Sequence, residues 1–599
     1  MLSKTEFSVL NAVRKHPHAS QRALAEGAQV SLGTVNTQLK SLASRDFVTA
    51  DGVITDAGLN ALAPYRVDNA IIMAAGLSSR FAPISYERPK GVLRVRGEVL
   101  IERQIRQLHE AGIDDITVVV GYKKEEFFYL EDRFGVNIEV NGDYAARNNN
   151  STLFLVRDRL ANTYICSSDD YFTENVFEPY VYEAYYAAEY ADGPTDEYCL
   201  ETGAHDVITG VTVGGQNAWY MLGQVYFDRA FSRRFVKILE DEYDRPETAP
   251  KLWEDIYRDH LDTLRLHLRK YAPGVINEFD SLDELREFDP DFVRNVDSEI
   301  FDNICRVLGC DREAIHGIVP IKKGLTNLSF MFVVGDMSYV YRHPGANTGG
   351  IIDRASETFS QQVAAKLGID DTFVCEDPKT GWKVSRFIEG CTPFEYHNAD
   401  EVVAALALVR KLHTCGEHST WTFDVFEKAQ ELIDILKPTG RLAFPGFEPL
   451  LRAVAAVRDN ARADAVPTCL CHNDFYAPNI LVAADRVRLI DWEYSGESDY
   501  ASDLGTFICC SDYTEDEADR VFEAYFGRAP EPAEYAHCQA YVCLSSFYWF
   551  VWALYQDESG KPVGAYQYRW YRFARVYADR ALKAYAALGR AVPQVEQRA

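Results

Sequence analysis

The sequence predicts a multidomain protein of the α/β and α+β classes, with three domains along the chain. A length of 599 residues is too great for one hydrophobic core, so several domains are expected. From Val67 onward, short apolar strands alternate with amphipathic helices, which is typical of an α/β domain with a mixed, mostly parallel sheet. After Asp289-Pro290 a pattern of strands followed by long helices begins. We therefore predict domains over residues 1–65, 66–293 and 294–599.

Composition and charge exclude several classes of protein. Hydrophobic residues make up 47% and charged residues 25% of the chain, as in ordinary globular proteins. No apolar run approaches the length that crosses a bilayer, and the first residues carry no apolar signal core. We therefore expect a cytoplasmic protein without a membrane span. A formal charge of −28 argues against a protein that coats nucleic acid or anionic membranes.

The thirteen cysteines are scattered and form no CxxC pair. Cys469 and Cys471 alternate along a predicted strand, and Cys509 and Cys510 are adjacent. We expect all of them to serve as small buried apolar residues rather than as zinc ligands or disulfides.

The first 65 residues predict a small helical domain. Apolar residues recur at helical spacing from Thr5 to Lys15, and Ser20 and Ser31 are placed to cap two further helices. Two short strands are expected around Ala50-Asp51-Gly52, and Thr55 begins a last helix. This order resembles the winged helix-turn-helix domains of bacterial regulators, in which the third helix enters the major groove of DNA. That helix offers Thr34, Asn36, Thr37, Gln38 and Lys40.

The net charge of this helical domain neither predicts nor excludes DNA binding. Six basic and five acidic residues give it a net charge of about +1, whereas duplex binders usually show a stronger basic footprint.

The second domain begins with a candidate phosphate-binding loop. The small residues Ala74, Ala75, Gly76, Ser78 and Ser79 directly follow the buried strand Asn69–Ala74. Small side chains let backbone N–H groups approach phosphate oxygens. Two catalytic cations are predicted to neutralise a triphosphate at this loop, namely Arg80 and, in the Arg88-Pro89-Lys90 segment, Lys90.

Residues 68 to about 290 resemble the bacterial phosphocholine cytidylyltransferases of the sugar-nucleotide pyrophosphorylase superfamily. The matching segments are Leu100-Ile101-Glu102, Val120-Gly121-Tyr122, Asn148-Asn149-Asn150-Ser151, Ser167-Ser168-Asp169-Asp170 and Glu278-Phe279-Asp280-Ser281. One departure is Ser78, which stands where the family has a second glycine.

The resemblance implies a cytidylyl transfer from CTP to phosphocholine with release of pyrophosphate. It implies Asp169 and Asp280 as Mg²⁺ ligands, with Asp170 as a less certain partner. It also implies a choline pocket that includes Trp253. The other aromatic candidates for that pocket are Tyr198, Trp219 and Tyr257.

The third domain carries a kinase-type catalytic loop. Asp474 and Asn479 have the D-x-x-x-x-N spacing, in which the aspartate accepts the proton of the attacking hydroxyl and the asparagine binds Mg²⁺. Asp491, after a short strand, occupies the place of a second metal ligand. Both acidic sites together predict a phosphotransferase.

The nucleotide-binding half of this domain is also predicted. The loop Gly324–Ser329, with Asn327 and Ser329, is placed to cover the phosphates. Arg342 stands where protein kinases place a strand lysine, and Glu357 on the next helix is its expected ion-pair partner. Two other basic residues, expected to be solvated, are alternatives to Arg342: Lys323 and Arg354.

Residues 296 to 590 resemble choline/ethanolamine kinases with a protein-kinase-like bilobal fold. Trp549 and Trp552 match the W-x-x-W of the family's choline cage, and Tyr568 and Tyr571 are nearby in sequence. Aromatic rings suit a quaternary ammonium, which donates no hydrogen bonds. Ethanolamine would need polar acceptors, which Glu493 or Asp499 could supply.

These features support the hypothesis of a bifunctional enzyme that makes CDP-choline from choline, ATP and CTP, with Mg²⁺ in both active sites. By resemblance, the product would serve the decoration of surface glycans or lipids with phosphocholine. Three alternatives remain at this point: ethanolamine or another amino alcohol as substrate, a DNA-binding regulator that senses choline metabolites, and an antibiotic phosphotransferase, since those enzymes share the His-Asn-Asp loop.

Overall fold

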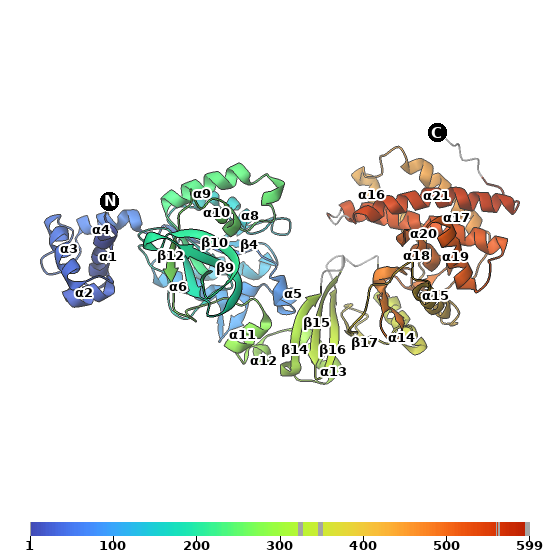
Figure 1. Ribbon diagram of the computed structural model, residues 1–599, viewed down its shortest axis with the longest axis horizontal. Coiled ribbons are helices and arrows are strands. Elements are labelled where there is room, and N and C mark those ends of the chain that lie inside the picture. Colours follow the sequence, from blue (N-terminus) through green and yellow to red (C-terminus); the bar gives the residue numbers. More distant parts are fainter. Residues whose placement is uncertain (1, 322–326, 345–351, 559, 561–562, 593–599) are drawn as a thin grey trace. The chain divides into compact units, whose positions relative to one another are not determined.

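The computed structural model describes residues 2–321, 327–344, 352–558, 560 and 563–592 (Figure 1). The chain forms two compact units, residues 1–301 and 302–599. The first unit contains the helical and α/β domains, and the second contains most of the third predicted domain. The boundaries near 65 and 293 stay predictions. Within the described residues, no helix combines the length and the apolar character that crossing a membrane requires.

The N-terminal domain has the helix order of a winged helix. It consists of α1 (Lys4–Lys15), α2 (Gln21–Gly27), α3 (Leu32–Ser44) and α4 (Asp56–Leu62). The predicted caps are confirmed, because Ser20, Ser31 and Thr55 each accept a hydrogen bond from the backbone N–H three residues later. The two predicted strands are reduced to one bridge between Val48 and Ile54.

Helix α1 attaches the winged helix to the α/β domain. Three of its basic side chains contact that domain: Lys4 contacts Glu183, Lys15 contacts Glu178, and Arg14 lies over the ring of Tyr180. The rings of Tyr65 and Tyr182 stack with centroids 5.4 Å apart. Three of the six basic side chains of this domain therefore contact the α/β domain.

The α/β domain is built on a mixed sheet whose central strand is β1 (Asn69–Ala74). Strand β1 pairs in parallel with β4 (Ile116–Val120) and β6 (Thr163–Ser167), so the predicted strand Asn69–Ala74 is confirmed and lies between two parallel neighbours. The order along the sheet is β10-β9-β11-β6-β1-β4-β5. The added strands are β5 (Asn137–Val140), β8 (Tyr185–Tyr190), β9 (Pro194–Thr202), β10 (Ile208–Gln216), β11 (Trp219–Phe227) and β12 (His267–Lys270).

Helices cover both faces of this sheet, because alternate residues of β1 belong to different cores. Ala70 and Ile72 pack in a cluster with α6 (Leu100–Glu110) and α7 (Tyr129–Phe134), whereas Ile71 belongs to a second cluster. The helices of the second cluster are α8 (Asn150–Leu155), α9 (Arg229–Glu242) and α10 (Trp253–Asp259). Parallel strands end at one edge, so the segments after β1 and β6 meet there.

The second unit begins with an antiparallel sheet of order β14-β15-β16-β18-β17. The strands are β14 (Ile315–Ile321), β15 (Asn327–Val334), β16 (Met337–Pro344), β17 (Phe373–Glu376) and β18 (Lys383–Arg386). Helix α14 (Arg354–Leu367) follows β16. This order agrees with the pattern of strands followed by long helices that the sequence predicts after Asp289-Pro290.

The rest of the second unit is mainly helical (Figure 1). Its helices are α15 (Ala399–His413), α16 (Val425–Leu436), α17 (Phe447–Arg462), α18 (Ala501–Cys510), α19 (Glu515–Phe526), α20 (Pro532–Glu558) and α21 (Ala565–Ala587). Two short antiparallel pairs flank the catalytic loop: β19 (Cys469–Cys471) with β22 (Gly496–Ser498), and β20 (Ile480–Val482) with β21 (Val487–Leu489). A sheet lobe followed by a helical lobe is the predicted kinase-like fold.

Candidate active sites

The predicted phosphate-binding loop leaves the edge of the sheet where β1 ends. The carbonyl oxygen of Ala75 accepts a hydrogen bond of 3.1 Å from the N–H of Tyr122, which ties the loop to the segment after β4. Ser78 has a φ of +47°, a conformation that glycine adopts most readily. The serine therefore keeps the backbone turn that the family makes with glycine.

Lys90 is fixed against the end of β6. Its Nζ lies 2.8 Å from a carboxylate oxygen of Asp169, and the lysine side chain is only 7% exposed. The next residue must be glycine for this approach, because a Cβ at Gly91 would come within 2.8 Å of the Ser168 side chain. The predicted cation and the predicted metal ligand are thus brought into direct contact.

Asp280 and Glu278 approach the same place from a distant part of the chain. Arg80 forms an ion pair of 2.8 Å with Asp280, and this arginine is 78% exposed. Desolvation, followed by the charge of Asp169, raises the pKa of Glu278 to about 8, although part of this residue is exposed. Carboxylates that repel one another in this way form a site that a cation would stabilise.

Asp170 is the most buried carboxylate of this group. It is 1% exposed, and neither of its carboxylate oxygens has a hydrogen-bond partner. Its pKa is raised by burial and by the charges of Glu278 and Asp169. Helix α6 holds its backbone, because Gln104 donates hydrogen bonds to the carbonyl oxygens of Ser167 and Asp170. An orphaned carboxylate beside two others fits a divalent cation.

Trp253 does not line a ligand pocket, contrary to the sequence prediction. It is 1% exposed and lies in the core between the sheet and α9. Its ring stacks on Tyr186 at 5.7 Å with an angle of 9° between the planes. The next residue, Glu254, accepts hydrogen bonds from Tyr186 and Asn149, and burial raises its pKa to about 7.

Tyr186 is the ring that connects this helix to the carboxylates. Burial and the charges of Glu254, Glu278 and Asp170 all raise its pKa, so these groups lie within electrostatic reach of it. The side of the α/β domain that holds the predicted metal ligands therefore also contains an aromatic ring and a further carboxylate.

In the second unit, the catalytic loop is held by buried hydrogen bonds. Asn479 donates a bond of 2.8 Å to the Asp474 carboxylate, as the D-x-x-x-x-N spacing predicts. Asp503 on α18 accepts hydrogen bonds from the backbone N–H groups of His472 and Asn473, at 2.9 and 2.6 Å. Burial, followed by the charge of Asp491, raises the pKa of Asp474, which makes its carboxylate a stronger base.

Asp491 faces the nucleotide-binding residues. It has a φ of +66° and lies 3.8 Å from Arg342. Arg342 forms buried ion pairs with Glu357 and, at 2.9 Å, with Glu376. The predicted Arg342–Glu357 contact is therefore present, and Glu376 adds a second carboxylate that the sequence did not indicate.

Two further cations surround Glu357. Arg354, for which the sequence predicted a solvated side chain, is 12% exposed and lies 2.7 Å from Glu357. Lys383 lies 3.5 Å from the same carboxylate. Lys323 and the loop residues 324–326 lie outside the described residues. Asn327 and Ser329 are located in β15, where Ser329 pairs with Arg342 of β16.

The predicted indole pair belongs to a larger cluster of rings. The rings of Trp549 and Trp552 are 5.4 Å apart at an angle of 81°, and Trp570 lies within 6.4 Å of both. Tyr494 lies 5.7 Å from Trp549, and Tyr566 lies 5.3 Å from Trp570. We call these five residues the ring cluster.

The ring cluster is connected to the catalytic loop. The side chain of Asn473 donates a hydrogen bond of 3.1 Å to the carbonyl oxygen of Tyr494. Burial raises the pKa of Tyr494, and the charges of Glu493 and Asp474 contribute to the same shift. The ring cluster, in which only Tyr566 is more than 7% exposed, thus lies within electrostatic reach of the predicted catalytic base.

Tyr568 and Tyr571 are not part of the ring cluster, which corrects the sequence prediction. Tyr568 is 71% exposed on α21. Tyr571 contacts the rings of Phe444 and Phe550 instead. The member of α21 that reaches the indoles is Trp570, which lies between the two predicted tyrosines in the sequence.

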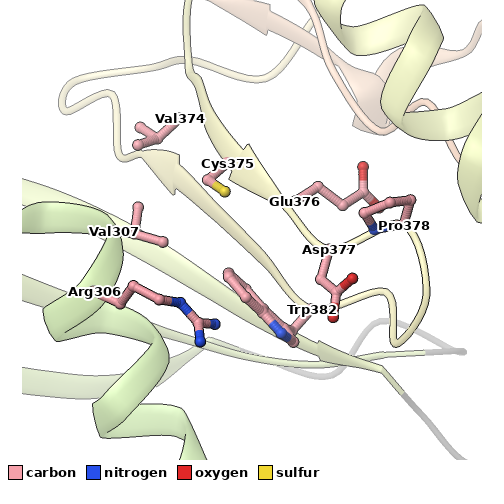
Figure 2. A pocket seen from close by; sticks show the side chains of 8 residues that line it. All are labelled: Arg306, Val307, Val374, Cys375, Glu376, Asp377, Pro378 and Trp382. Atoms are coloured by element: carbon pink, nitrogen blue, oxygen red, sulfur yellow. The ribbon is translucent and has the colours of Figure 1, made fainter.

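A separate pocket of about 500 Å³ lies on the sheet lobe (Figure 2). Arg306, on α13 (Glu299–Leu308), lies over the ring of Trp382 at 5.6 Å. Glu376 is also on its wall, but Figure 2 shows its side chain directed away from Arg306 and Trp382. Glu376 binds Arg342 instead, and Arg342 is not among the residues that line this pocket.

Several site residues were given no role from the sequence, among them Glu254, Glu278, Glu376, Asp503 and Trp570. Glu278 carried a usable signal, because residues two apart in an extended segment face the same side, and Asp280 was already predicted as a ligand. Asp503 and Trp570 are separated from their partners by many residues, so only the tertiary structure relates them to the site.

The folds and the two clusters define a nucleotidyltransferase joined to a phosphotransferase, preceded by a winged helix. Three family models match the chain accordingly. They are "Winged helix-turn-helix DNA-binding" over residues 2–49, "MobA-like NTP transferase domain" over 70–151 and "Phosphotransferase enzyme family" over 318–541.

Relatives exist for both enzyme domains. A choline-phosphate cytidylyltransferase of Streptococcus pneumoniae is 31% identical over 220 residues, which are 37% of this chain and 96% of that protein. A 2-aminoethylphosphonate cytidylyltransferase of Lancefieldella rimae is 34% identical over 229 residues, 38% of this chain and 93% of that protein. Protein LicA of Haemophilus influenzae is 25% identical over 256 residues, 40% of this chain and 94% of that protein.

Through its α/β domain, the chain belongs to the cytidylyltransferase family of the first two relatives. Its second unit is a kinase domain of the phosphotransferase type. The protein is therefore an enzyme with two transferase domains.

Proposed function

We propose that the protein makes CDP-choline in two steps, by phosphorylation of choline with ATP and then by cytidylyl transfer from CTP to phosphocholine. The observation that carries this proposal is the ring cluster beside Asp474. It is an aromatic surface for a methylated ammonium next to the base that would activate the hydroxyl of the same molecule. The two domains would then act in succession on one head group.

In the kinase step, Asp474 accepts the proton of the choline hydroxyl as its oxygen bonds to the γ-phosphorus of ATP, and ADP leaves. Asn479 fixes the orientation of Asp474 through their hydrogen bond. Asn479 and Asp491 would hold Mg²⁺, which when bound neutralises phosphate charge. Arg342, fixed by Glu357 and Glu376, supplies positive charge beside Asp491.

In the cytidylyl step, a phosphocholine oxygen attacks the α-phosphorus of CTP and pyrophosphate leaves. Lys90 and Arg80 approach the loop after β1 from two sides and counter the charge of the triphosphate. Asp169, Glu278 and Asp280 would hold Mg²⁺, which when bound brings the two anions together. Tyr186 and Glu254 are the groups on this side of the domain that suit a cationic head group.

Choline is favoured over ethanolamine by the composition of the ring cluster. A primary ammonium needs hydrogen-bond acceptors to replace the water that it loses. The five side chains of the ring cluster are aromatic, and an aromatic surface of this kind favours trimethylammonium. It equally favours choline over the polycationic substrates of antibiotic phosphotransferases.

The phosphonate named for one relative is a rival substrate for the cytidylyltransferase domain. A phosphonate already carries its phosphorus group through a carbon–phosphorus bond and needs no kinase to acquire it. The presence of a kinase domain in the same chain therefore favours a phosphate ester made from an alcohol.

One experiment tests the whole proposal. The full chain is incubated with ATP, CTP and Mg²⁺ together with choline, ethanolamine or 2-aminoethylphosphonate, and the products are identified by mass spectrometry. We expect CDP-choline to form fastest by at least tenfold. A preference for ethanolamine would contradict the role of the ring cluster, and turnover of the phosphonate alone would contradict the two-step sequence.

We propose that the product serves the attachment of phosphocholine to surface glycans or lipids, in line with the family resemblance. Supply of CDP-choline to isolated envelope fractions, followed by detection of bound phosphocholine, tests this use.

DNA binding by the winged helix is a second candidate function. The exposed face of α3 carries Asn36, Thr37 and Lys40 and no carboxylate. Because three basic residues of α1 are engaged with the α/β domain, few phosphate contacts remain, and we expect weak, salt-sensitive binding. A gel shift with DNA upstream of the gene, with and without CTP, tests this candidate, and the Lys40→Ala variant should abolish any shift.

A further inference from the structure

Two thiols and an imidazole meet directly behind the kinase catalytic loop. Cys469 and Cys471 lie on β19, which ends immediately before His472, and His413 is the last residue of α15. One ligand atom from each of the three lies within 4.8 Å of the other two. These three residues have no role in the proposed phosphotransfer, in which none of them binds substrate or takes part in catalysis.

The sulfur positions match those of two ligands on one metal ion. The Sγ atoms of Cys469 and Cys471 are 3.6 Å apart. Two thiolates on a tetrahedral Zn²⁺, with Zn–S bonds of about 2.3 Å, are separated by about 3.8 Å. The alternation of a strand places both sulfurs on one face, so almost no movement is needed to reach this separation.

The imidazole of His413 is oriented as metal-binding histidines usually are. Its Nε2 lies 2.8 Å from a carboxylate oxygen of Asp503, and its Nδ1 lies 2.8 Å from the hydroxyl of Tyr525. A metal-binding histidine commonly donates its second N–H to a carboxylate, which fixes the ring and strengthens the ligand. With Nε2–H on Asp503, Nδ1 can turn its lone pair to a metal in place of the tyrosine hydroxyl.

The surroundings favour a positive ion. The carboxylates of Asp499 and Asp503 act electrostatically on the Cys471 sulfur. Cys471 is fully buried, whereas Cys469 is half-buried. Two sulfurs and one nitrogen are the donor set that Zn²⁺ prefers over Mg²⁺.

We propose that Cys469, Cys471 and His413 bind a soft divalent metal ion, with Zn²⁺ as the expected ion and a fourth position open to water. The ion stabilises the catalytic loop, because Asp503 joins His413 to the backbone N–H groups of His472 and Asn473. The site is separate from the two Mg²⁺ sites of the proposed reactions and depends on neither of them.

Cobalt binding by the full chain tests the proposal. Co²⁺ replaces Zn²⁺ in such sites and gives a thiolate-to-cobalt charge-transfer absorption, which carboxylate-bound Co²⁺ does not give. We expect the metal-free protein to take up one Co²⁺ per chain with this absorption and to lose it when Zn²⁺ is added. Zn²⁺ should also raise the temperature at which the kinase unit unfolds.

Two cysteine variants decide the assignment. Cys469→Ser should lose the charge-transfer absorption and the thermal shift, and it should bind Co²⁺ at least tenfold more weakly. Cys391→Ser, at another half-buried cysteine of the same unit, should behave as the parent protein. The proposal is overturned if the parent protein gives no thiolate–cobalt absorption or if Cys469→Ser binds as the parent does. Circular dichroism of both variants checks that they are folded.

Discussion

The two head-group predictions, one for each enzyme domain, met different outcomes in the structure. In the kinase unit, Trp549 and Trp552 are in contact and join three further rings beside the catalytic loop. In the α/β domain, Trp253 is a core residue whose ring stacks on Tyr186. A pair of aromatic residues at helical spacing fixes a common face, whereas a single tryptophan at the start of a helix leaves its direction undetermined.

The two domains also balance their carboxylates differently. In the kinase unit, Arg342 is buried between Glu357 and Glu376. In the α/β domain, Lys90 is buried on Asp169, but Arg80 is exposed on Asp280, and Asp170 has no hydrogen-bond partner for its carboxylate. We therefore expect the site in the α/β domain to depend more strongly on an added cation than the site in the kinase unit.

The largest expected effect separates the two sites completely. Asp474→Asn removes the proposed base of the kinase, so phosphocholine formation should fall by roughly 100- to 10,000-fold. Cytidylyl transfer to supplied phosphocholine should be unchanged. Asp169→Asn should give the reverse pattern, because it removes a proposed metal ligand and the partner of Lys90. Each activity is assayed on the purified full chain with its own substrate.

The reciprocal design supplies its own control, since each variant should keep one activity at the level of the parent protein. Loss of both activities in a folded variant would mean that the sites are not independent.

The next effect contrasts a core tryptophan with a ligand-binding one. Trp253→Ala should lower the free energy of unfolding of the α/β domain by about 3–5 kcal/mol, as large core truncations do. The enzyme that stays folded should keep its KM for phosphocholine. Chemical denaturation followed by tryptophan fluorescence measures the stability change. A raised KM for phosphocholine with unchanged stability would show that Trp253 binds the head group and is not a core residue.

In the kinase unit, Trp552 is 7% exposed, so its truncation should also lower the stability, but here we expect the KM to change as well. Trp552→Ala should raise the KM for choline by about 30-fold, since a desolvated cation–π contact contributes about 2 kcal/mol. Tyr568→Ala, on the exposed side of α21, is the matched control and should leave the KM unchanged. If both substitutions change the KM for choline equally, the ring cluster serves packing and does not bind choline.

The sequence predicted the regular elements and the charged motifs better than the aromatic and long-range partners. Strand β1 was predicted with its observed bounds because a buried parallel strand is a continuous apolar run. Asp474 and Asn479 were paired by spacing alone, and their hydrogen bond is present. Tyr568 was misplaced because its position on the helix, set by packing of α20 on α21, determines which residue faces the indoles.

The thiol cluster shows the same limit. Cys469 and Cys471 were visible in the sequence as an alternating pair, but His413 is far from them along the chain. Helix α15 brings the imidazole of His413 to the strand that carries the two cysteines. The sequence predicted these cysteines as apolar residues because it could not show this third donor.

A smaller effect concerns the response of the cytidylyltransferase site to pH. The protein around Glu278 and the charge of Asp169 raise the pKa of Glu278 to about 8. Because a metal ion binds the ionised carboxylate, the affinity for Mg²⁺ should rise about tenfold as the pH rises through this value. Glu278→Gln should remove most of that dependence. Isothermal titration with Mg²⁺ at several pH values measures it, and equal slopes for both proteins would exclude Glu278 as a ligand.

The kinase unit should respond to alkaline pH in the opposite direction. His537 is buried between Asp464 and Asp499, at 2.7 and 2.9 Å. Burial alone lowers the pKa of a histidine, but these two carboxylates outweigh it and raise the pKa of His537 to about 9. The charged form is therefore favoured in the folded state, which contributes about 3 kcal/mol of stability below pH 6.5.

This contribution should be lost as the pH rises from about 6.5 through about 9, because the imidazolium then loses its proton. His537→Gln keeps a neutral side chain of similar size, so it should be less stable than the parent protein at low pH and almost equal to it above pH 9. Urea unfolding of the two proteins across this range measures the difference. If the difference in stability between the two proteins stays constant with pH, His537 acts by packing and not by charge. Alkaline pH would then not weaken the kinase unit through this histidine.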